Sequence, residues 1–151
     1  MYVDLMYVDA VVHIAAPKAR VWGLFADVDG WARWNPTIVS SSAWRGQPWV
    51  PGFRLRQTVL IGRRRLSFRP RVTESDPGTF VTWEGRSLGI TGVHSWYFEE
   101  ETGGTRVTTI EQFNGPGLFL MRILFKPEAV QTMFRASLEG LKLAAEAIHD
   151  P

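Results

Sequence analysis

The chain has no cysteine among its 151 residues. Disulfide bonds, thiolate nucleophiles and cysteine-ligated metal sites are therefore excluded, and a reducing compartment is compatible with the composition. The sequence also lacks any run of 18 or more apolar residues, so it predicts no membrane-spanning helix. Residues 1–10 carry two Asp and no Lys or Arg, unlike the start of a secretory signal peptide. We therefore expect a cytoplasmic protein.

Lysine is scarce, because the chain contains three Lys against fourteen Arg. The net charge of +2 is too small to require a nucleic-acid partner. The three histidines, at positions 13, 94 and 149, do not have the spacing of a metal site. No phosphate-binding loop, dinucleotide fingerprint or nucleophile-elbow motif is present. We expect no metal, no cofactor and no nucleic-acid partner, and the sequence does not determine the oligomeric state.

The length of 151 residues suits one domain, and 45% hydrophobic residues are typical of a globular protein. The tetrapeptide MYVD occurs at residues 1–4 and again at 6–9. We interpret residues 1–5 as a misassigned start or a cloning remnant, and place the single domain at 6–151.

The hydrophobic pattern predicts an α+β protein. A helix opens at Pro17 and ends near Asp29-Gly30, and a short second helix covers about 30–34 before Asn35-Pro36 stops it. An apolar turn from Leu118 to Phe125 precedes a long amphipathic helix, which Pro127 kinks or restarts. The predicted strands are 6–14, 37–44, 53–60, 64–74, 79–86, 90–100 and 105–113.

The turns between the strands set their register. Two-residue turns at Gly62-Arg63, Leu88-Gly89 and Gly103-Gly104 are typical of hairpins, and a four-residue loop covers Ser75–Gly78. They predict the following opposite pairs: Val59 and Leu66, Gln57 and Phe68, Phe53 and Val72, Val72 and Val81, Trp83 and His94, Val81 and Trp96, Trp96 and Glu111, and His94 and Phe113. One face of this antiparallel sheet is then apolar and the other carries most of the arginines, which supports the register.

Several segments resemble the START-like (SRPBCC) superfamily, in particular its polyketide cyclase/dehydrase branch. The matching segments are APKARVWGLFADVDGWARWNP at 16–36, PGF at 51–53, VTWEG at 81–85, GGTRVTTIEQFNG at 103–115 and SLEGLKLAAE at 137–146. The resemblance implies a helix-grip (Bet v 1/START-like) fold, in which a curved sheet of about seven strands surrounds the C-terminal helix. It implies a cavity between the two, and relatives that bind lipids or polyketides, act as cyclases, or activate a chaperone.

The polar residues on the apolar face are the candidates for chemistry. The register puts Gln57, His94, Thr109 and Glu111 there, with His94 diagonal to Glu111 and within hydrogen-bond reach. A buried carboxylate needs a partner or a raised pKa. His94 and Glu111 are the candidate catalytic acid–base pair, although a satisfied structural pair has the same pattern. The candidate ligand-binding residues are Trp34, Gln57, Phe68, Trp83, Trp96, Phe98, Thr109, Met121, Phe125 and Phe134.

Three functions remain open at this stage. The first is binding of a small hydrophobic ligand, lipid-like or aromatic, between the sheet and the last helix. The second is a cyclase/dehydrase-type enzyme that uses Glu111 and His94. The third is a protein-interaction domain like the chaperone-activating relatives.

The segment WARWNP at 31–36 and the arginine-rich face also lead to predictions. We expect Trp31 to pack on the first helix as part of the core and Trp34 to face the mouth of the cavity. Between residues 54 and 86 lie eight Arg and three acids, most of these Arg on the outer sheet face. That face is either a solvated surface or a site for an anionic partner.

Overall fold

The computed structural model describes residues 6–148 of the chain. The interpretation of residues 1–5 as an extension therefore lies outside the described residues. Eight strands and four α-helices are arranged in the order β1, α1, α2, β2–β8, α3, α4, with a 3₁₀ turn at Val28–Gly30 between α1 and α2. Their bounds are β1 Met6–Ile14, α1 Lys18–Ala26, α2 Trp31–Trp34, β2 Ile38–Arg45, β3 Arg54–Ile61, β4 Arg64–Phe68, β5 Arg71–Asp76, β6 Phe80–Ser87, β7 Ile90–Glu101, β8 Gly104–Asn114, α3 Leu118–Leu124 and α4 Pro127–Ala147.

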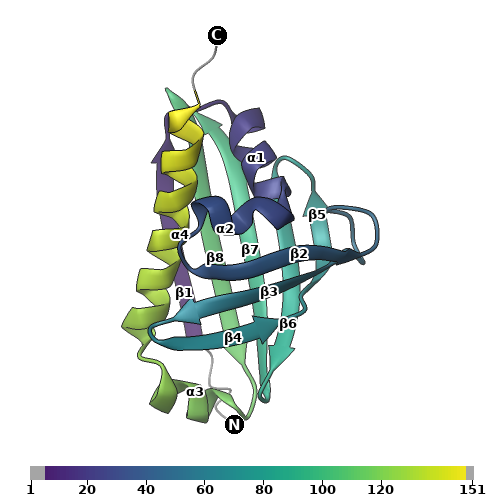
Figure 1. Cartoon of the computed structure of the whole chain (residues 1–151), viewed down its shortest axis with the longest axis vertical. Coiled ribbons are helices and arrows are strands. Elements are labelled where there is room, and N and C mark those ends of the chain that lie inside the picture. Colours follow the sequence, from purple (N-terminus) through teal and green to yellow (C-terminus); the bar gives the residue numbers. More distant parts are fainter. Residues whose placement is uncertain (1–5, 149–151) are drawn as a thin grey trace.

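One curved antiparallel sheet contains all eight strands, in the order β1-β8-β7-β6-β5-β3-β2, with β4 paired to β3. Figure 1 shows α4 running along β1 at one side of the sheet, while β2, β3 and β4 cross the other strands in front. The concave face of the sheet and α4 enclose the core. This is the predicted helix-grip arrangement, and the α+β class is confirmed.

The long helix begins where the sequence predicts it. Pro127 occupies the first turn of α4, where its missing N–H costs no hydrogen bond. The buried side of α4 presents an i, i+3, i+4 stripe that packs on the sheet. The stripe consists of Val130, Phe134, Ser137, Leu138, Leu141 and Ala145. Within residues 6–148, no helix has the length and apolar content needed to cross a membrane.

Three predicted elements differ from the structure in type or by more than one residue at an end. The first helix ends at Ala26, and a 3₁₀ turn at Val28–Gly30 separates it from α2. The predicted strand 64–74 is two strands, because Pro70 has no N–H for the ladder and the pairing moves from β3–β4 to β5–β6. The apolar turn at Leu118–Phe125 forms helix α3.

The predicted register is correct for the hairpins β3–β4 and β6–β7, where Gln57 lies opposite Phe68 and Trp83 opposite His94. It is wrong by two residues in β7–β8, where His94 lies opposite Glu111 rather than Phe113. The turn there is Thr102-Gly103, because Gly104 already pairs with Glu101.

Gly104 is needed for close packing between strands and not for the turn. A Cβ on Gly104 would lie 2.0 Å from the carbonyl oxygen of Ile14, so the glycine allows β1 to approach β8. In β5–β6, Val72 lies opposite Trp83 rather than Val81. A β-bulge between Val72 and Glu74 and a shorter loop account for this shift. The inward-facing Val72 and His94 are each displaced by two residues from their predicted partners, so the inner face keeps its predicted members.

Candidate functional site

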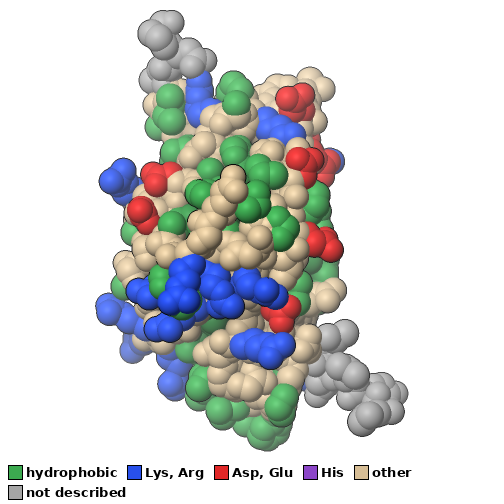
Figure 2. All heavy atoms as spheres, turned by 90° about the vertical axis from the view of Figure 1, so that its right-hand side faces the viewer, with side chains coloured by type: hydrophobic (Ala, Val, Ile, Leu, Met, Phe, Trp, Pro, Cys, Tyr) green, Lys and Arg blue, Asp and Glu red, His purple; other side chains and the backbone are tan. Residues whose placement is uncertain are grey.

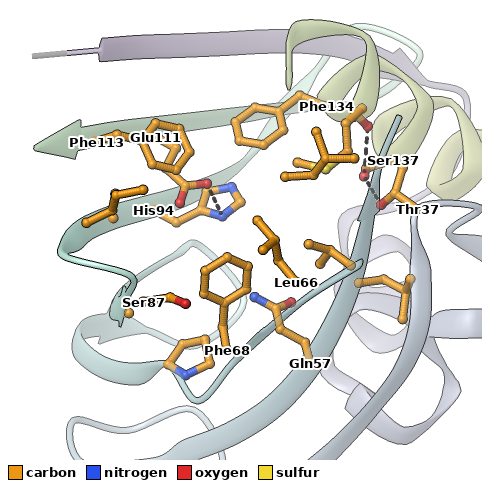
Figure 3. A pocket seen from close by; sticks show the side chains of 18 of the residues that line it. Thr37, Gln57, Leu66, Phe68, Ser87, His94, Glu111, Phe113, Phe134 and Ser137 are labelled. Carbon is orange, nitrogen blue, oxygen red and sulfur yellow. Dashed lines mark hydrogen bonds and ion pairs between the residues drawn. The ribbon is translucent and has the colours of Figure 1, made fainter. Parts of the chain in front are cut away.

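A cavity of about 100 Å³ lies between the concave face of the sheet and helices α2, α3 and α4. Figure 3 shows its side chains converging from β3, β4, β7 and β8 on one side and α4 on the other. Eleven of the predicted site residues line it: Trp34, Gln57, Phe68, Trp83, His94, Trp96, Thr109, Glu111, Met121, Phe125 and Phe134. Most of the wall is apolar or aromatic, which is typical of a site for an apolar ligand.

Phe98 is the predicted residue that lies elsewhere. It is fully buried in an aromatic cluster with Trp22 and Phe25, at ring-centroid distances of 5.2 and 5.0 Å. Trp31 packs beside this cluster against Phe25, and its indole N–H donates to the carbonyl oxygen of Phe25 at 2.7 Å. The prediction that Trp31 belongs to the core next to the first helix is confirmed. The cluster closes the cavity at the end near α1.

His94 forms the centre of a short polar chain across β7 and β8. Its Nδ1 lies 3.1 Å from Oε2 of Glu111, and its Nε2 lies 2.5 Å from Oγ1 of Thr109. The imidazole also stacks on the ring of Phe134 from α4, with 5.1 Å between centroids and 4° between planes. The corrected register makes the contact with Glu111 direct rather than diagonal, and it adds Thr109 as a second partner.

Burial keeps this pair uncharged. Desolvation lowers the pKa of His94 from 6.5 to about 3, and it raises the pKa of Glu111 from 4.5 to about 8. At neutral pH the protonated carboxyl of Glu111 therefore donates to Nδ1 of His94. The Nε2–H of His94 then donates to Thr109. With its one O–H donated to His94, Glu111 offers a ligand the other carboxyl oxygen as an acceptor, and it can donate to a ligand only in place of the bond to His94. His94 is a poor proton acceptor at this pH.

A glycine of β7, Gly92, makes room for the Glu111 side chain. Gly85 of β6 and Gly92 of β7 lie opposite each other, and both line the cavity. A Cβ on Gly92 would lie 2.7 Å from Oε1 of Glu111. The missing side chain of Gly92 therefore leaves space for the carboxyl beside the sheet.

Two indole N–H groups at the cavity have no partner among the described residues. Nε1 of Trp34 and Nε1 of Trp96 are both buried without a hydrogen bond. A buried donor without a partner costs about 1–3 kcal/mol. Both rings line the cavity. Trp34, which was predicted to face the mouth of the cavity, is half-buried on α2 and lines the cavity wall.

A second polar cluster was not predicted. The side-chain oxygen of Asn35 accepts from the backbone N–H of Thr37 at 3.0 Å and from the hydroxyls of Thr37 and Ser137 at 2.7 and 3.2 Å. All three residues are buried and line the cavity (Figure 3 labels Thr37 and Ser137). The sequence signal was Ser137, a polar residue inside the apolar stripe of the last helix.

The match to a protein family covers nearly the whole chain. The family described as polyketide cyclase / dehydrase and lipid transport matches residues 7–146. No curated protein sequence matches the chain.

Solved structures with the same fold include proteins of low sequence identity. The di-domain ARO/CYC protein BexL from the BE-7585A biosynthetic pathway is 19% identical, with a TM-score of 0.77 over 96% of this chain. This chain spans about half (51%) of that two-domain protein. A protein from Thermus thermophilus is 22% identical, with a TM-score of 0.77 over 94% of this chain and 100% of that one. A START superfamily protein from Mycobacterium smegmatis is 14% identical, with a TM-score of 0.72 over 93% of this chain and 97% of that one.

Proposed function

The chain belongs to the polyketide cyclase / dehydrase and lipid transport family of the START-like superfamily, and from this we propose that it binds a small hydrophobic ligand in the cavity. The observation that carries the proposal is the cavity wall itself. Aromatic side chains from the sheet and α4 enclose an interior with a few polar groups aimed into it. A ligand of matching shape fills this cavity and buries its own apolar surface against the apolar wall, which favours binding.

The volume of the cavity sets the size of the ligand. About 100 Å³ is somewhat less than the ~150 Å³ of an engineered apolar cavity that binds benzene. A single ring is therefore close to the limit in this conformation, and a larger ligand displaces part of the wall. Helix α3 is the wall that moves most readily, because it has only seven residues and leaves Phe119 and Ile123 76% and 65% exposed.

A lipid-like or polyketide-like ligand is consistent with the polar groups. The indole N–H groups of Trp34 and Trp96 are unpartnered hydrogen-bond donors, so they favour a ligand with carbonyl or hydroxyl oxygens. The BexL protein is described as an ARO/CYC protein of a biosynthetic pathway, which agrees with a polyketide-like ligand.

A cyclase/dehydrase-type reaction is the second candidate, favoured by the raised pKa of Glu111. A carboxyl that stays protonated at neutral pH can donate its proton to a ligand carbonyl. The low pKa of His94 argues against its predicted role as the base of an acid–base pair. Binding without catalysis needs only the donors, so it is the simpler function.

Isothermal titration calorimetry with phenol, 2-naphthol and 2-acetonaphthone tests the binding function. We expect saturable binding of at least one ring probe, and a weaker affinity after Phe134→Ala, because that ring forms part of the wall. Glu139→Gln, on the exposed side of α4, serves as a control and should bind like the wild type. The absence of binding for all three probes, or equal binding by the Phe134 variant, would contradict the proposal.

A further inference from the structure

A basic groove crosses the outer face of the sheet over β2 to β6. Its walls carry the five arginines Arg54, Arg56, Arg69, Arg71 and Arg86, together with serine and threonine hydroxyls and the single acid Glu84. Figure 2 shows Lys and Arg side chains gathered in one band on this face of the molecule. The groove is open to solvent and has a volume of about 900 Å³.

The strand register places like charges opposite each other in this groove and beside it. Arg45 of β2 lies opposite Arg54 of β3, and Arg54 lies opposite Arg71 of β5. Like charges in directly opposite positions destabilise a sheet. The one acid in this row of opposite residues is Glu84 of β6, which lies opposite Arg71. This arrangement disfavours folding, and an anion bound between the arginines would offset the repulsion.

Three guanidinium groups also gather over one indole ring. Arg45, Arg56 and Arg69 lie 4.6, 4.5 and 5.2 Å from the ring centroid of Trp44. Within residues 6–148, none of these three forms an ion pair, and Arg86 with Glu84 at 3.4 Å is the one pair in the groove. The cation–π contacts hold these guanidinium groups close together, and the N–H groups of Arg56 and Arg69 line the groove, where they remain available to an anion.

The groove and the inner cavity meet at one point. Gln57 and Phe68 line both of them. At this point β4 approaches β6 without pairing to it, because β4 pairs with β3 and the pairing of β5 with β6 ends at Arg71–Glu84. Gly85 and Ser87 of β6 line the cavity on the inner side, and Arg86 between them lines the groove on the outer side. The sheet therefore has a gap whose inner side is apolar and whose outer side is cationic.

We propose that the ligand is an apolar molecule bearing a phosphate group, with its apolar part in the cavity and its phosphate bound by Arg54, Arg69 and Arg71 in the groove. The inference rests on the proposed binding function and adds the chemical class of the ligand. Guanidinium groups bind phosphate through paired N–H donors, and hydroxyls beside them supply further donors. Phe68 and Gln57 would lie beside the part of the ligand that passes through the sheet.

Calorimetry with three probes tests this inference: 2-naphthol, 2-naphthyl phosphate and inorganic phosphate. We expect 2-naphthyl phosphate to bind at least about tenfold more tightly than either 2-naphthol or inorganic phosphate. In the double variant Arg54→Gln, Arg69→Gln this advantage should disappear, while the affinity for 2-naphthol stays unchanged. The advantage should also decrease as salt is raised from about 50 to about 300 mM. Arg135→Gln, an exposed arginine on α4, is the matched control and should change none of these affinities.

The two ways in which the inference can fail are distinguishable. If 2-naphthol binds in the cavity but the phosphate ester gains nothing over it, the inference is wrong and the proposed function stands. If the ester binds only as well as inorganic phosphate, and Phe134→Ala leaves its affinity unchanged, the groove acts independently of the cavity and the inference is likewise overturned. Retained folding of the double variant is checked by its thermal unfolding, and we expect its Tm to rise because repulsion between the arginines is reduced.

Discussion

The Nδ1 atom of His94 lies 3.1 Å from Oε2 of Glu111, its direct partner across β7 and β8, and both side chains are largely withdrawn from solvent. In the folded chain the pKa of Glu111 is about 8, above its ordinary 4.5, and that of His94 is about 3, below its ordinary 6.5. The pair is therefore neutral over a wide range of pH. Because the pair is neutral in the folded chain, the fold becomes less stable at high pH and at low pH.

The first prediction concerns this coupling. Between about pH 4.5 and 8 the unfolded chain has lost the Glu111 proton and the folded chain keeps it, which lowers the free energy of unfolding as pH rises. His94 has the opposite effect between about pH 3 and 6.5, so the two effects cancel from about pH 4.5 to 6.5 and the net decline lies between about pH 6.5 and 8. Below about pH 4.5 the free energy of unfolding falls as pH decreases, because the unfolded chain protonates His94 and the folded chain does not. Each slope reaches at most about 1.4 kcal/mol per pH unit.

Urea unfolding of Glu111→Gln between pH 5 and 9 measures the first of these slopes. The amide still donates to Nδ1 of His94 but does not ionise, so the decline between pH 6.5 and 8 should become smaller in the variant. Glu139→Gln, exposed on α4, should retain the wild-type profile. An unchanged decline in Glu111→Gln would show that the carboxyl ionises normally in the folded chain.

The second prediction concerns Thr109. Thr109→Val removes the acceptor of the His94 Nε2–H at nearly constant volume, and it should lower the free energy of unfolding by about 1–3 kcal/mol. Thr108→Val, on the outer face of the same strand, is the matched control and should have little effect. Chemical denaturation measures both, and equal stabilities would mean that the hydrogen bond to Thr109 does not contribute.

The third prediction uses two helical glycines with opposite surroundings. A Cβ on Gly140 of α4 would lie 2.0 Å from the carbonyl oxygen of Trp34, so Gly140→Ala should push α2 from α4 and destabilise the fold by about 1–3 kcal/mol. A Cβ on Gly23 of α1 meets nothing within 4 Å, so Gly23→Ala should stabilise the fold by up to about 1 kcal/mol. Thermal unfolding compares the two, and a stabilised Gly140 variant would contradict the close packing of α2 on α4.

The fourth prediction concerns the unpartnered indole of Trp96. Trp96→Phe removes the N–H and keeps an aromatic ring in the wall. The variant should lose more affinity for 2-acetonaphthone, which carries a carbonyl acceptor, than for naphthalene, which carries none. Fluorescence titration of both probes gives the ratio of affinities. Equal losses for the two probes would mean that this N–H does not contact a ligand.

Much of the fold could be predicted from the sequence, because alternation along the strands separates the two faces of the sheet. The assignment of side chains to the two faces stayed correct despite errors in individual pairs, since a shift by two residues returns each side chain to the same face. The contact between His94 and Glu111 depended on which residues form the β7–β8 turn. Gly103-Gly104 looked like the turn, whereas Gly104 serves the close approach of β1.

The features that could not be predicted depend on packing between distant segments. Asn35 reads as a helix stop in the sequence, and only the position of α4 brings Ser137 to its side-chain oxygen. Phe98 shares the inner face with Trp96, but the first helix places Trp22 and Phe25 against it and excludes it from the cavity. The gap between β4 and β6 follows from Pro70, which divides one predicted strand into two.

Binding of an apolar ligand in the cavity is tested most directly by the indole N–H signals of the tryptophans in ¹⁵N–¹H NMR spectra. On addition of 2-naphthol, the signals of Trp34 and Trp96 should shift most, because both N–H groups are buried at the cavity without a partner. The signal of Trp44, which lies under the arginines on the outer face, should stay in place. Shifts confined to Trp44, or none at Trp34 and Trp96 at saturating probe, would contradict the account.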